Sequence, residues 1–333
     1  MPLPKVGVTL GDPTGIGPEI VVKALSKKAP YQFCRPIVFG DQRVLLKTID
    51  RLGTRANVEI LKEAPEEGYS PRKIFLLPLS QLRTTSLRFG KPDRACGLAM
   101  VRYVEEAVRW VRDGKLDALT TCPINKHAIR EAGYPFSGHT ELLAHLARAS
   151  AVAMMFVGSK WKIVLVTTHL PLHKVAKAIT KDRVLSTIHL TAEGLGKYFG
   201  ITRPRIAVLG LNPHSGEEGV LGDEERREII PALKKAKSRE IDVKGPFSAD
   251  SFFNLSDASF DAVVAMYHDQ GLIPIKMLDF QRAVNFTLGL PFIRTSVGHG
   301  TAYDIAGKGL ADPNNLINAI LLASNLSKLK KKY

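Results

Sequence analysis

Residues 5–27 read KVGVTLGDPTGIGPEIVVKALSK and set out the plan of the chain. The apolar run 5–10 predicts a strand, and the stretch from Pro18 predicts a helix, because proline is favoured in the first helical turn. Glu19 suits the positive N-terminal end of that helix. The glycines between them let backbone N–H groups approach a ligand closely. A tight turn without a ligand explains them equally well, since the dinucleotide-binding pattern G-x-G-x-x-G is absent.

The same alternation of strand and helix continues along the chain and predicts an α/β fold with a largely parallel sheet. The predicted strands are 5–10, 36–39, 57–60, 73–79, 117–121, 152–158, 162–168, 205–211, 261–266 and 283–289. The predicted helices are 18–27, 94–115, 139–150, 180–200 and 223–237. No Ser/Gly-rich linker separates two domains, so we expect them to be joined through the sheet, with a boundary near residues 120–127.

Composition narrows the class of protein. The chain has 333 residues, of which 45% are apolar and 24% charged, enough for two domains with real cores. Its three cysteines are odd in number and far apart, which predicts no disulfide framework and favours a reducing compartment. We see no signal peptide and no apolar run of about 18 residues. We therefore expect a cytoplasmic protein without a membrane partner.

The formal net charge is +15, which raises the question of nucleic-acid binding. Lys and Arg are spread over the whole chain, and the one dense cluster is the tail KLKKKY at 328–333. Aromatic residues do not alternate with basic ones as they do in stacking platforms. We predict a basic, solvated surface that attracts a phosphorylated substrate, and no nucleic-acid partner.

Three histidines follow apolar runs that we predict to be strands. His169 follows 162–168, His214 follows 205–211, and His268 follows 261–266. In open α/β sheets, ligands bind beyond the carboxyl ends of parallel strands, so three such imidazoles in one sheet would face one crevice. Three neutral imidazoles suit a divalent transition metal with one position left open for substrate. Each histidine taken alone is also consistent with a hydrogen-bonded loop or core residue.

A further polar set suits a phosphorylated substrate. His139 and Thr140 begin a predicted helix, whose free N–H groups favour an anion. Asn285 and Arg294 lie further along, and Lys276 closes the stretch MYHDQGLIPIK at 266–276. There we expect the glycine-bearing turn to return Lys276 to the site of His268. Arg offers a planar fork and Lys a point charge for phosphate, although each could also be a surface charge.

The stretch SVGHGTAYDIAGKGLADP at 296–313 is a second glycine-rich loop, and it contains His299, Gly300 and Asp304. An aspartate in such a loop can accept hydrogen bonds from ribose hydroxyls, which suggests a nucleotide. A surface loop between two elements is the alternative.

Together these stretches resemble the PdxA family of 4-hydroxythreonine-4-phosphate dehydrogenases, in order and over essentially the whole chain. The matching motifs include GDPTGIGPEI, GHTELLA, THLPL, NPHSGEEG, GPFSADSFF, YHDQGLIPIK and VNFTLGLPFIRTSVGHGTA. The segment DIAGKG is also similar to the cofactor loop of isopropylmalate and isocitrate dehydrogenases. Cys122 stands where the family usually has glycine, and we expect its thiol to be packed.

The resemblance implies a homodimer of two-domain α/β/α subunits with an isocitrate dehydrogenase-like fold. We expect residues 1–125 and 300–333 in one domain, residues 126–299 in the other, and the active site in the cleft between them at the dimer interface. It also implies one divalent metal per subunit (zinc, magnesium or cobalt), a cofactor that is NAD or NADP, and metal ligands contributed by both subunits. The implied metal ligands are His169, His214 and His268, and the implied substrate residues are His139, Thr140, Lys276, Asn285 and Arg294. For the cofactor we select Asp12, Gly15, Gly17, His299, Gly300 and Asp304.

The implied reaction oxidises 4-phosphohydroxy-L-threonine to a 3-keto acid that loses CO2 to give 3-amino-2-oxopropyl phosphate, in vitamin B6 biosynthesis. We expect Lys276 to act as an acid/base group or carboxylate partner, and Asp269 and Asp250 to orient ligands. Relatives with the same metal histidines act on 4-phospho-D-threonate, 4-phospho-D-erythronate or aromatic cis-dihydrodiol carboxylates, and these alternatives stay open.

Overall fold

The computed structural model describes residues 2–330 except 86, 137 and 255–258, so the end of the basic tail lies outside the described residues. The chain divides into two compact units. The first contains residues 2–150 and 290–328, and the second contains residues 151–289 and 329–330. Each unit combines β-strands with helices that cover them. Every strand and helix predicted from the sequence is present. The α/β prediction is confirmed.

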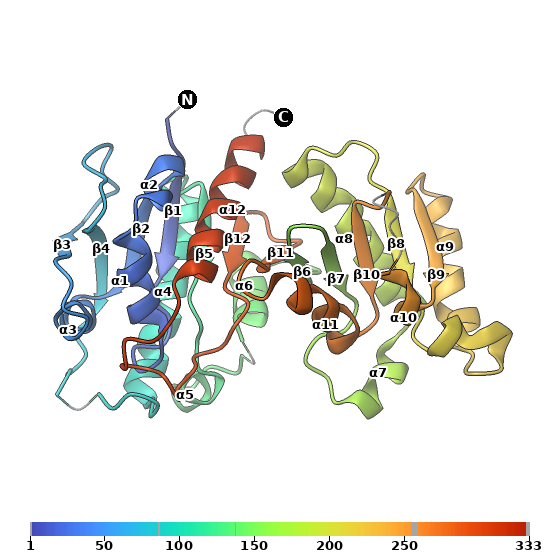
Figure 1. Cartoon of the computed structure of the whole chain (residues 1–333), viewed down its shortest axis with the longest axis horizontal. Helices are drawn as coiled ribbons and strands as arrows, with labels where there is room; N and C mark the ends of the chain where they lie inside the picture. The colour runs from blue at the N-terminus through green and yellow to red at the C-terminus, as the bar shows by residue number, and fades with distance from the viewer. Residues whose placement is uncertain (1, 86, 137, 255–258, 331–333) are drawn as a thin grey trace. The chain divides into compact units, whose positions relative to one another are not determined.

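The sheet of the first unit has the order β3-β4-β2-β1-β5-β12, and every neighbouring pair is parallel. Figure 1 shows α1 and α12 in front of this sheet and α4 behind it. The strands are β1 (Lys5–Thr9), β2 (Arg35–Asp41), β3 (Asn57–Ile60), β4 (Lys73–Ser80), β5 (Ala118–Thr121) and β12 (Ile293–Ser296). The helices are α1 (Gly17–Leu25), α2 (Ala29–Phe33), α3 (Gln42–Arg51), α4 (Arg94–Arg112), α5 (Lys126–Glu131), α6 (His139–Ala147) and α12 (Asn314–Lys330).

The sheet of the second unit has the order β11-β6-β7-β10-β8-β9. Neighbours from β7 to β9 are parallel, whereas β6 runs antiparallel to both β11 and β7, so "largely parallel" holds for only part of this sheet. The reason is local: residues 158–161 between β6 and β7 are too few for a crossover. The strands are β6 (Ala153–Val157), β7 (Lys162–Leu165), β8 (Ile206–Leu209), β9 (Val243–Phe247), β10 (Ala262–Ala265) and β11 (Val284–Leu288).

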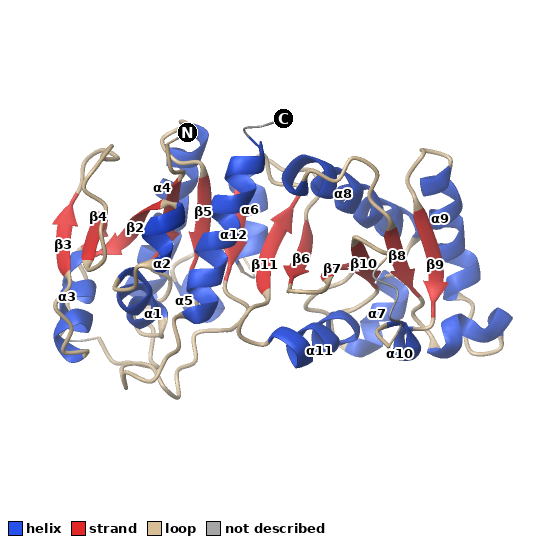
Figure 2. Ribbon diagram, turned by 45° about the horizontal axis from the view of Figure 1, so that its top comes forward, coloured by secondary structure: helices blue, strands red, loops and turns tan. Residues whose placement is uncertain are grey.

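Helices and turns of the second unit cover its strands and extend beyond their ends. Figure 2 shows α7, α10 and α11 on the side where β8 and β9 end. The four residues of β8 and of β10 are all buried, as expected for parallel strands covered on both faces. The helical segments are α7 (Leu172–Ala178), α8 (Lys181–Phe199), η1 (Pro213–Gly219), η2 (Glu225–Ile229), α9 (Ile230–Lys237), α10 (Ala249–Phe252) and α11 (His268–Asp279).

The observed units differ from the domains expected from the sequence. Residues 126–150 and 290–299 belong to the first unit, not the second. The cause is packing, because α6 contacts α4, and β12 pairs with β5 in parallel register. His139, Thr140 and Arg294 therefore lie in the unit that also carries the two glycine-rich loops. Cys122 is fully buried, as expected.

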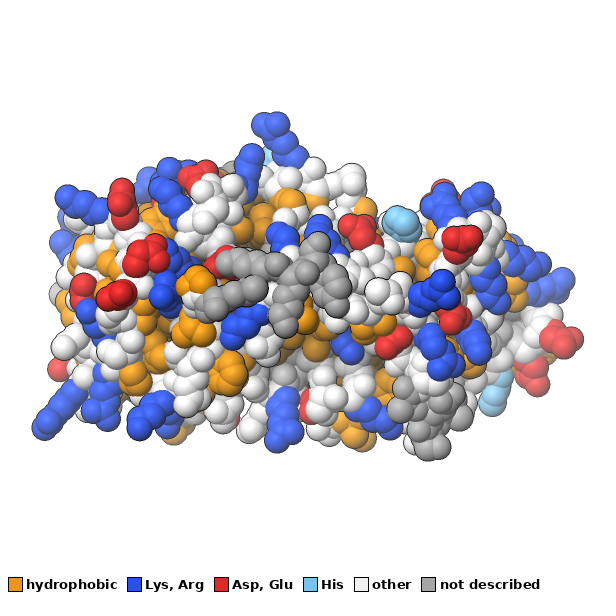
Figure 3. Space-filling view, turned by 90° about the horizontal axis from the view of Figure 1, so that it is seen from above, with side chains coloured by type: hydrophobic (Ala, Val, Ile, Leu, Met, Phe, Trp, Pro, Cys, Tyr) orange, Lys and Arg blue, Asp and Glu red, His pale blue; other side chains and the backbone are white. Residues whose placement is uncertain are grey.

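The surface of the chain agrees with the scattered charge seen in the sequence. On the face drawn in Figure 3, Lys and Arg side chains are interspersed with acidic and neutral ones and do not gather in one patch. Within the described residues, none of the helices is both long enough and apolar enough to cross a membrane.

Candidate active site

The three strands that precede the predicted metal histidines lie side by side in the second unit. β10 pairs in parallel with β7 on one side and with β8 on the other, so their carboxyl ends share one edge of the sheet. His169 follows β7, and His268 is the first residue of α11, directly after β10. His214 lies in η1, after β8. The predicted placement at neighbouring strand ends is confirmed, while the role of the three side chains as metal ligands stays a prediction.

Two of these imidazoles stand together. The ring centroids of His169 and His268 are 5.7 Å apart, and the ring planes are inclined by 44°. Nδ1 of His268 is 2.7 Å from Oδ1 of Asp269, so it donates to this carboxylate when it carries the proton. Such a bond holds the ring in the tautomer whose Nε2 lone pair can bind a metal. Asp269 thus has the contact expected of a residue that orients a ligand.

His214 sits in an unusual turn. Residues 214–218 all have left-handed backbone angles, with φ of 52° at His214 and 56° at Ser215. For a residue with a side chain this conformation costs roughly 1–2 kcal/mol. Several in succession persist only where surrounding contacts hold them, and such strain gathers at functional sites.

Asp250 lies close enough to His214 for their charges to interact. The Ser248 hydroxyl donates to Asp250 at 2.6 Å and lowers the pKa of this carboxyl, and the charge of His214 lowers it further. Within the described part of the chain, no three His, Cys, Asp or Glu side chains stand close enough together to hold a metal. The donor chemistry still fits a divalent ion, because an imidazole pair is supported by a carboxylate, with a further imidazole on the neighbouring strand end.

The sequence expectation for Lys276 was wrong in its geometry. No turn follows His268, because residues 268–279 form one helix, α11, that includes Gly271 and Pro274. Gly271 serves packing: a Cβ there would lie 2.8 Å from side-chain atoms of Ile163 and Leu165, so its absence lets the helix approach β7. Lys276 therefore lies about 12 Å along the helix axis from His268.

In the first unit, β12 and α6 bring Arg294 and His139 together. The Arg294 side chain is 1% exposed, and its Nε and Nη2 donate to Oγ1 of Thr121 at 3.2 and 2.6 Å. Burial lowers the pKa of Arg294 to about 9. Burial and then the charge of Arg294 hold the pKa of His139 well below 6.5. A cation with little hydration beside a neutral imidazole is a strong binder for an anion such as phosphate.

Two buried polar atoms among the predicted substrate residues have no hydrogen-bond partner within the described residues. They are Nε2 of His139 and Oδ1 of Asn285. Asn285 lies in β11 of the second unit, opposite Phe156 of β6, and is 9% exposed. Buried polar groups normally find a partner, so each atom is a candidate for bonding a ligand. Thr140 is the second residue of α6, next to His139.

The two glycine-rich loops of the first unit pack on one another. The backbone N–H and the hydroxyl of Thr14 both donate to Oδ1 of Asp12 at 2.8 Å, and the Tyr303 hydroxyl donates to Oδ2. Ile16 N donates to Thr301 O at 3.1 Å. Asp12 is fully buried, so its role as a direct cofactor contact has to be revised: it joins the loops.

Gly15 and Gly17 also serve packing. A Cβ on Gly15 would lie 3.1 Å from Thr301 Cβ, and one on Gly17 would lie 2.2 Å from Leu10 O. Gly300 and Asp304 are exposed and remain available to a cofactor, and Nδ1 of His299 lies 3.0 Å from Gly300 O.

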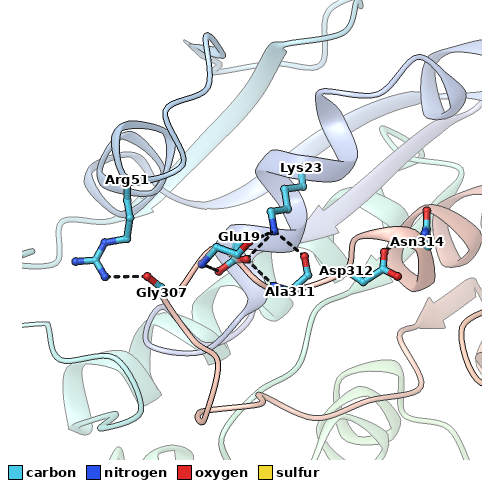
Figure 4. Close-up of polar contacts among 8 residues, drawn as sticks. Glu19, Lys23, Arg51, Gly307, Ala311, Asp312 and Asn314 are labelled. Atoms are coloured by element: carbon cyan, nitrogen blue, oxygen red, sulfur yellow. Dashed lines mark hydrogen bonds and ion pairs between the residues drawn. The ribbon is translucent and has the colours of Figure 1, made fainter.

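A polar clamp that the sequence did not predict holds the end of the second loop (Figure 4). Lys23 Nζ donates to Glu19 Oε1 and to the carbonyls of Gly309 and Ala311, all within 2.8 Å. Glu19 Oε1 in turn accepts from Ala311 N at 2.8 Å. Arg51 donates to Gly307 O at 3.0 Å. Glu19, which the sequence suggested as a partner of the helix dipole, is 3% exposed and positions the loop.

Similarity to known proteins extends over nearly the whole chain. Residues 32–323 match the family described as "Pyridoxal phosphate biosynthetic protein PdxA". A 4-hydroxythreonine-4-phosphate dehydrogenase of Desulforapulum autotrophicum is 49% identical over 96% of this chain and 95% of its own. The chain belongs to the PdxA family.

Solved structures agree with this membership of the PdxA family. The 4-hydroxythreonine-4-phosphate dehydrogenase of Klebsiella pneumoniae has a TM-score of 0.88 and 38% identity, covering 98% of each chain. A terephthalate 1,2-cis-dihydrodiol dehydrogenase of Burkholderia xenovorans has a TM-score of 0.64 and 30% identity, covering 97% of this chain and 98% of its own. The protein is therefore a PdxA-family dehydrogenase with this family's fold.

Sequence reasoning missed two residues that tie the strand ends of the second unit. The Gln270 side chain accepts from Met266 N and donates to Gly210 O, both at 2.7 Å, and so joins the end of β10 to the end of β8. Glu225 is 2% exposed and binds the segment before His214. The sequence could have pointed to Gln270, because it stands two residues after the predicted metal ligand His268. Glu225 had none, because nothing in an acidic helical stretch marks one carboxylate as buried.

Proposed function

We propose that this PdxA-family protein oxidises 4-phosphohydroxy-L-threonine with NAD or NADP in vitamin B6 biosynthesis. The 3-keto acid formed would lose CO2 to give 3-amino-2-oxopropyl phosphate. The observation that carries this proposal is the relative at 49% identity, matched end to end and named 4-hydroxythreonine-4-phosphate dehydrogenase. Arg294, which is buried, and His139, which is half-buried, support a phosphorylated substrate, because donors with little hydration gain most from a dianion.

Phosphate would bind Arg294 and His139 with the N-terminus of α6 at Thr140, and Asn285 would donate to or accept from the substrate. His169 and His268 would hold a divalent metal, with His214 completing the set across a dimer. When bound, zinc, magnesium or cobalt supplies a Lewis acid beside the reacting hydroxyl. Asp269 would keep His268 in its ligand tautomer through the contact with Nδ1, and Asp250 would interact with His214 through its charge.

Lys276 would move the proton or bind the substrate carboxylate. It lies on α11 two helical turns from His268, so it would reach a part of the substrate about 12 Å along the helix axis from that histidine. His299, Gly300 and Asp304 would contact the nicotinamide cofactor, with Asp304 accepting from ribose hydroxyls.

A homodimer is part of the proposal and is supported by α11 itself. Ile273, Met277, Leu278 and Phe280 are 57%, 82%, 60% and 72% exposed. They cover one side and the end of the helix that carries His268 and Lys276. Exposed apolar patches of this kind mark protein interfaces. A second copy on this face would bring the catalytic residues of two subunits together. We further propose that the protein acts in the cytoplasm, as the sequence predicts.

A second candidate substrate is 4-phospho-D-threonate. A protein of Clostridium botulinum named "Putative D-threonate 4-phosphate dehydrogenase" is 40% identical over 99% of this chain and 98% of its own. Both substrates carry the phosphate and the oxidised hydroxyl, so the same residues would hold either one.

The test is NADH formation by the purified protein with 4-phosphohydroxy-L-threonine, 4-phospho-D-threonate and 4-phospho-D-erythronate in parallel. Each assay is run with added zinc, magnesium or cobalt and again after chelation. Metal-dependent turnover that is fastest on the hydroxythreonine phosphate supports the proposal. Turnover confined to a threonate or erythronate phosphate keeps the site and replaces the substrate, and turnover that survives chelation contradicts the metal role.

A further inference from the structure

The strained turn at His214 has an internal support that no part of the proposed chemistry uses. Oε1 of Glu225 accepts from the backbone N–H groups of Leu211 and Asn212, both at 2.7 Å. Oε2 accepts from the side-chain amide of Asn212 at 2.9 Å. The carboxylate therefore holds two of the three residues that join β8 to η1, and these two lie three and two positions before His214.

The fit between this carboxylate and the turn is tight. A Cβ on Gly216 would lie 2.7 Å from Oε2 of Glu225, and Gly216 has φ of 82°. The close contact leaves no room for a side chain at Gly216, so glycine lets the left-handed turn close against the acid. Glu225 is the first residue of the π-helical turn η2, and such turns are frequent beside functional sites.

From the other side, Gln270 donates to Gly210 O. The end of β8 is thus held between Gln270, which comes from the helix of His268, and Glu225, which comes from η2. A strand end held from two sides restricts the directions in which the exposed imidazole of His214 can point.

We infer that Glu225 is the positioning residue for His214, which holds the left-handed turn in the conformation that directs this imidazole to the metal. The inference rests on the proposed metal role of His214. Glu225 touches neither substrate nor metal in this scheme and acts through the backbone of Leu211 and Asn212. Outer residues that orient metal ligands typically change metal affinity by about 10- to 100-fold when removed.

The test is cobalt(II) binding by the full-length protein without substrate or nicotinamide, followed by the visible absorption of the bound ion. Glu225→Ala should lower cobalt affinity about 10- to 100-fold and change the absorption bands, because one imidazole is misdirected. Glu225→Gln should stay within about threefold, since its carbonyl oxygen can still accept from Leu211 and Asn212. Glu225→Asp is too short to reach both amides and should lose at least about fivefold.

Asp41 provides a matched control. It is a fully buried carboxylate in the first unit that accepts from two backbone amides, Val44 N and Leu82 N, and from the Ser80 hydroxyl. Asp41→Ala should lower the unfolding temperature without changing cobalt affinity, which separates general destabilisation from positioning.

His214→Ala separates the two proposals. If this variant binds cobalt as the wild type does, the proposed role of His214 as a metal ligand fails. If it loses cobalt while Glu225→Ala, or Glu225→Asp where the alanine variant does not fold, binds within threefold of the wild type, the positioning role is overturned and the metal site stands.

Discussion

The polar groups at the strand ends of the two units have opposite surroundings. In the first unit Arg294 is buried, and burial depresses its pKa and that of His139. In the second unit His169 and His214 are exposed, and the side chain of His268 is 35% exposed. Buried donors are prepared for an anion before it arrives, because water is already excluded. The exposed imidazoles are still in contact with water, so the proposed metal would have to displace that water when it binds.

We expect the largest effect from removing one of the exposed histidines of the second unit. His268→Ala should abolish cobalt binding and lower turnover about 1,000-fold, because the Lewis acid and its several kcal/mol of transition-state stabilisation are lost. Metal content after dialysis and NADH formation measure the two effects. His145, which lies on α6 in the first unit, is the control: His145→Ala should keep its cobalt. Equal metal content in the two variants would remove His268 from the site.

Removing the buried cation of the first unit should have a smaller effect on activity and should leave metal binding unchanged. Arg294→Met should lower kcat/KM about 100-fold, the loss expected for charge-assisted bonds to phosphate, while cobalt affinity is unchanged. The unliganded variant should stay close to the wild type in stability, since the cost of burying a charge is removed together with the two bonds to Thr121. Thermal unfolding with and without substrate checks this: substrate should stabilise the wild type only. Equal stabilisation of both would show that the phosphate binds elsewhere.

The exposed apolar face of α11 should matter for assembly. Met277→Asp should convert a dimer into a monomer at micromolar concentration and lower activity per subunit about tenfold, because a charge at an apolar interface is costly. Analytical ultracentrifugation gives the mass. Leu46, 47% exposed on α3, is the control in the first unit. A wild type that is itself monomeric while fully active would contradict the shared site.

We expect the smallest effect in the pH dependence of the free energy of unfolding, to which His139 of the first unit contributes. His139 has a folded pKa well below 6.5, so below pH 6.5 the unfolded chain binds a proton that the folded chain does not. Stability should therefore fall as the pH drops below 6.5, with a contribution from this residue of about 1 kcal/mol between pH 7.5 and 5.5. Urea unfolding of the wild type and His139→Gln at both pH values measures it. If the two proteins lose equal stability on acidification, His139 is not held neutral by its surroundings.

Much of the fold was predictable because its signals are local. Runs such as 205–211 and 261–266 are continuous apolar segments between turn residues, and both contain central parallel strands. β12 was missed because its four residues include Arg294, and α11 because Gly271 and Pro274 suggested a turn. In both cases packing against a neighbour overruled the local preference.

The sequence by itself determined the family, the α/β class and the placement of three histidines after three strands, since motif order and hydrophobic pattern are written along the chain. Only the tertiary structure decided which strands are neighbours, that Asp12 joins two loops, that Lys276 continues a helix from His268, and that Glu225 grips the turn of His214. These facts depend on burial and on contacts between residues distant in sequence. The sequence does not distinguish an exposed glutamate from one whose carboxylate is buried among backbone amides, and only the fold gives the two different roles.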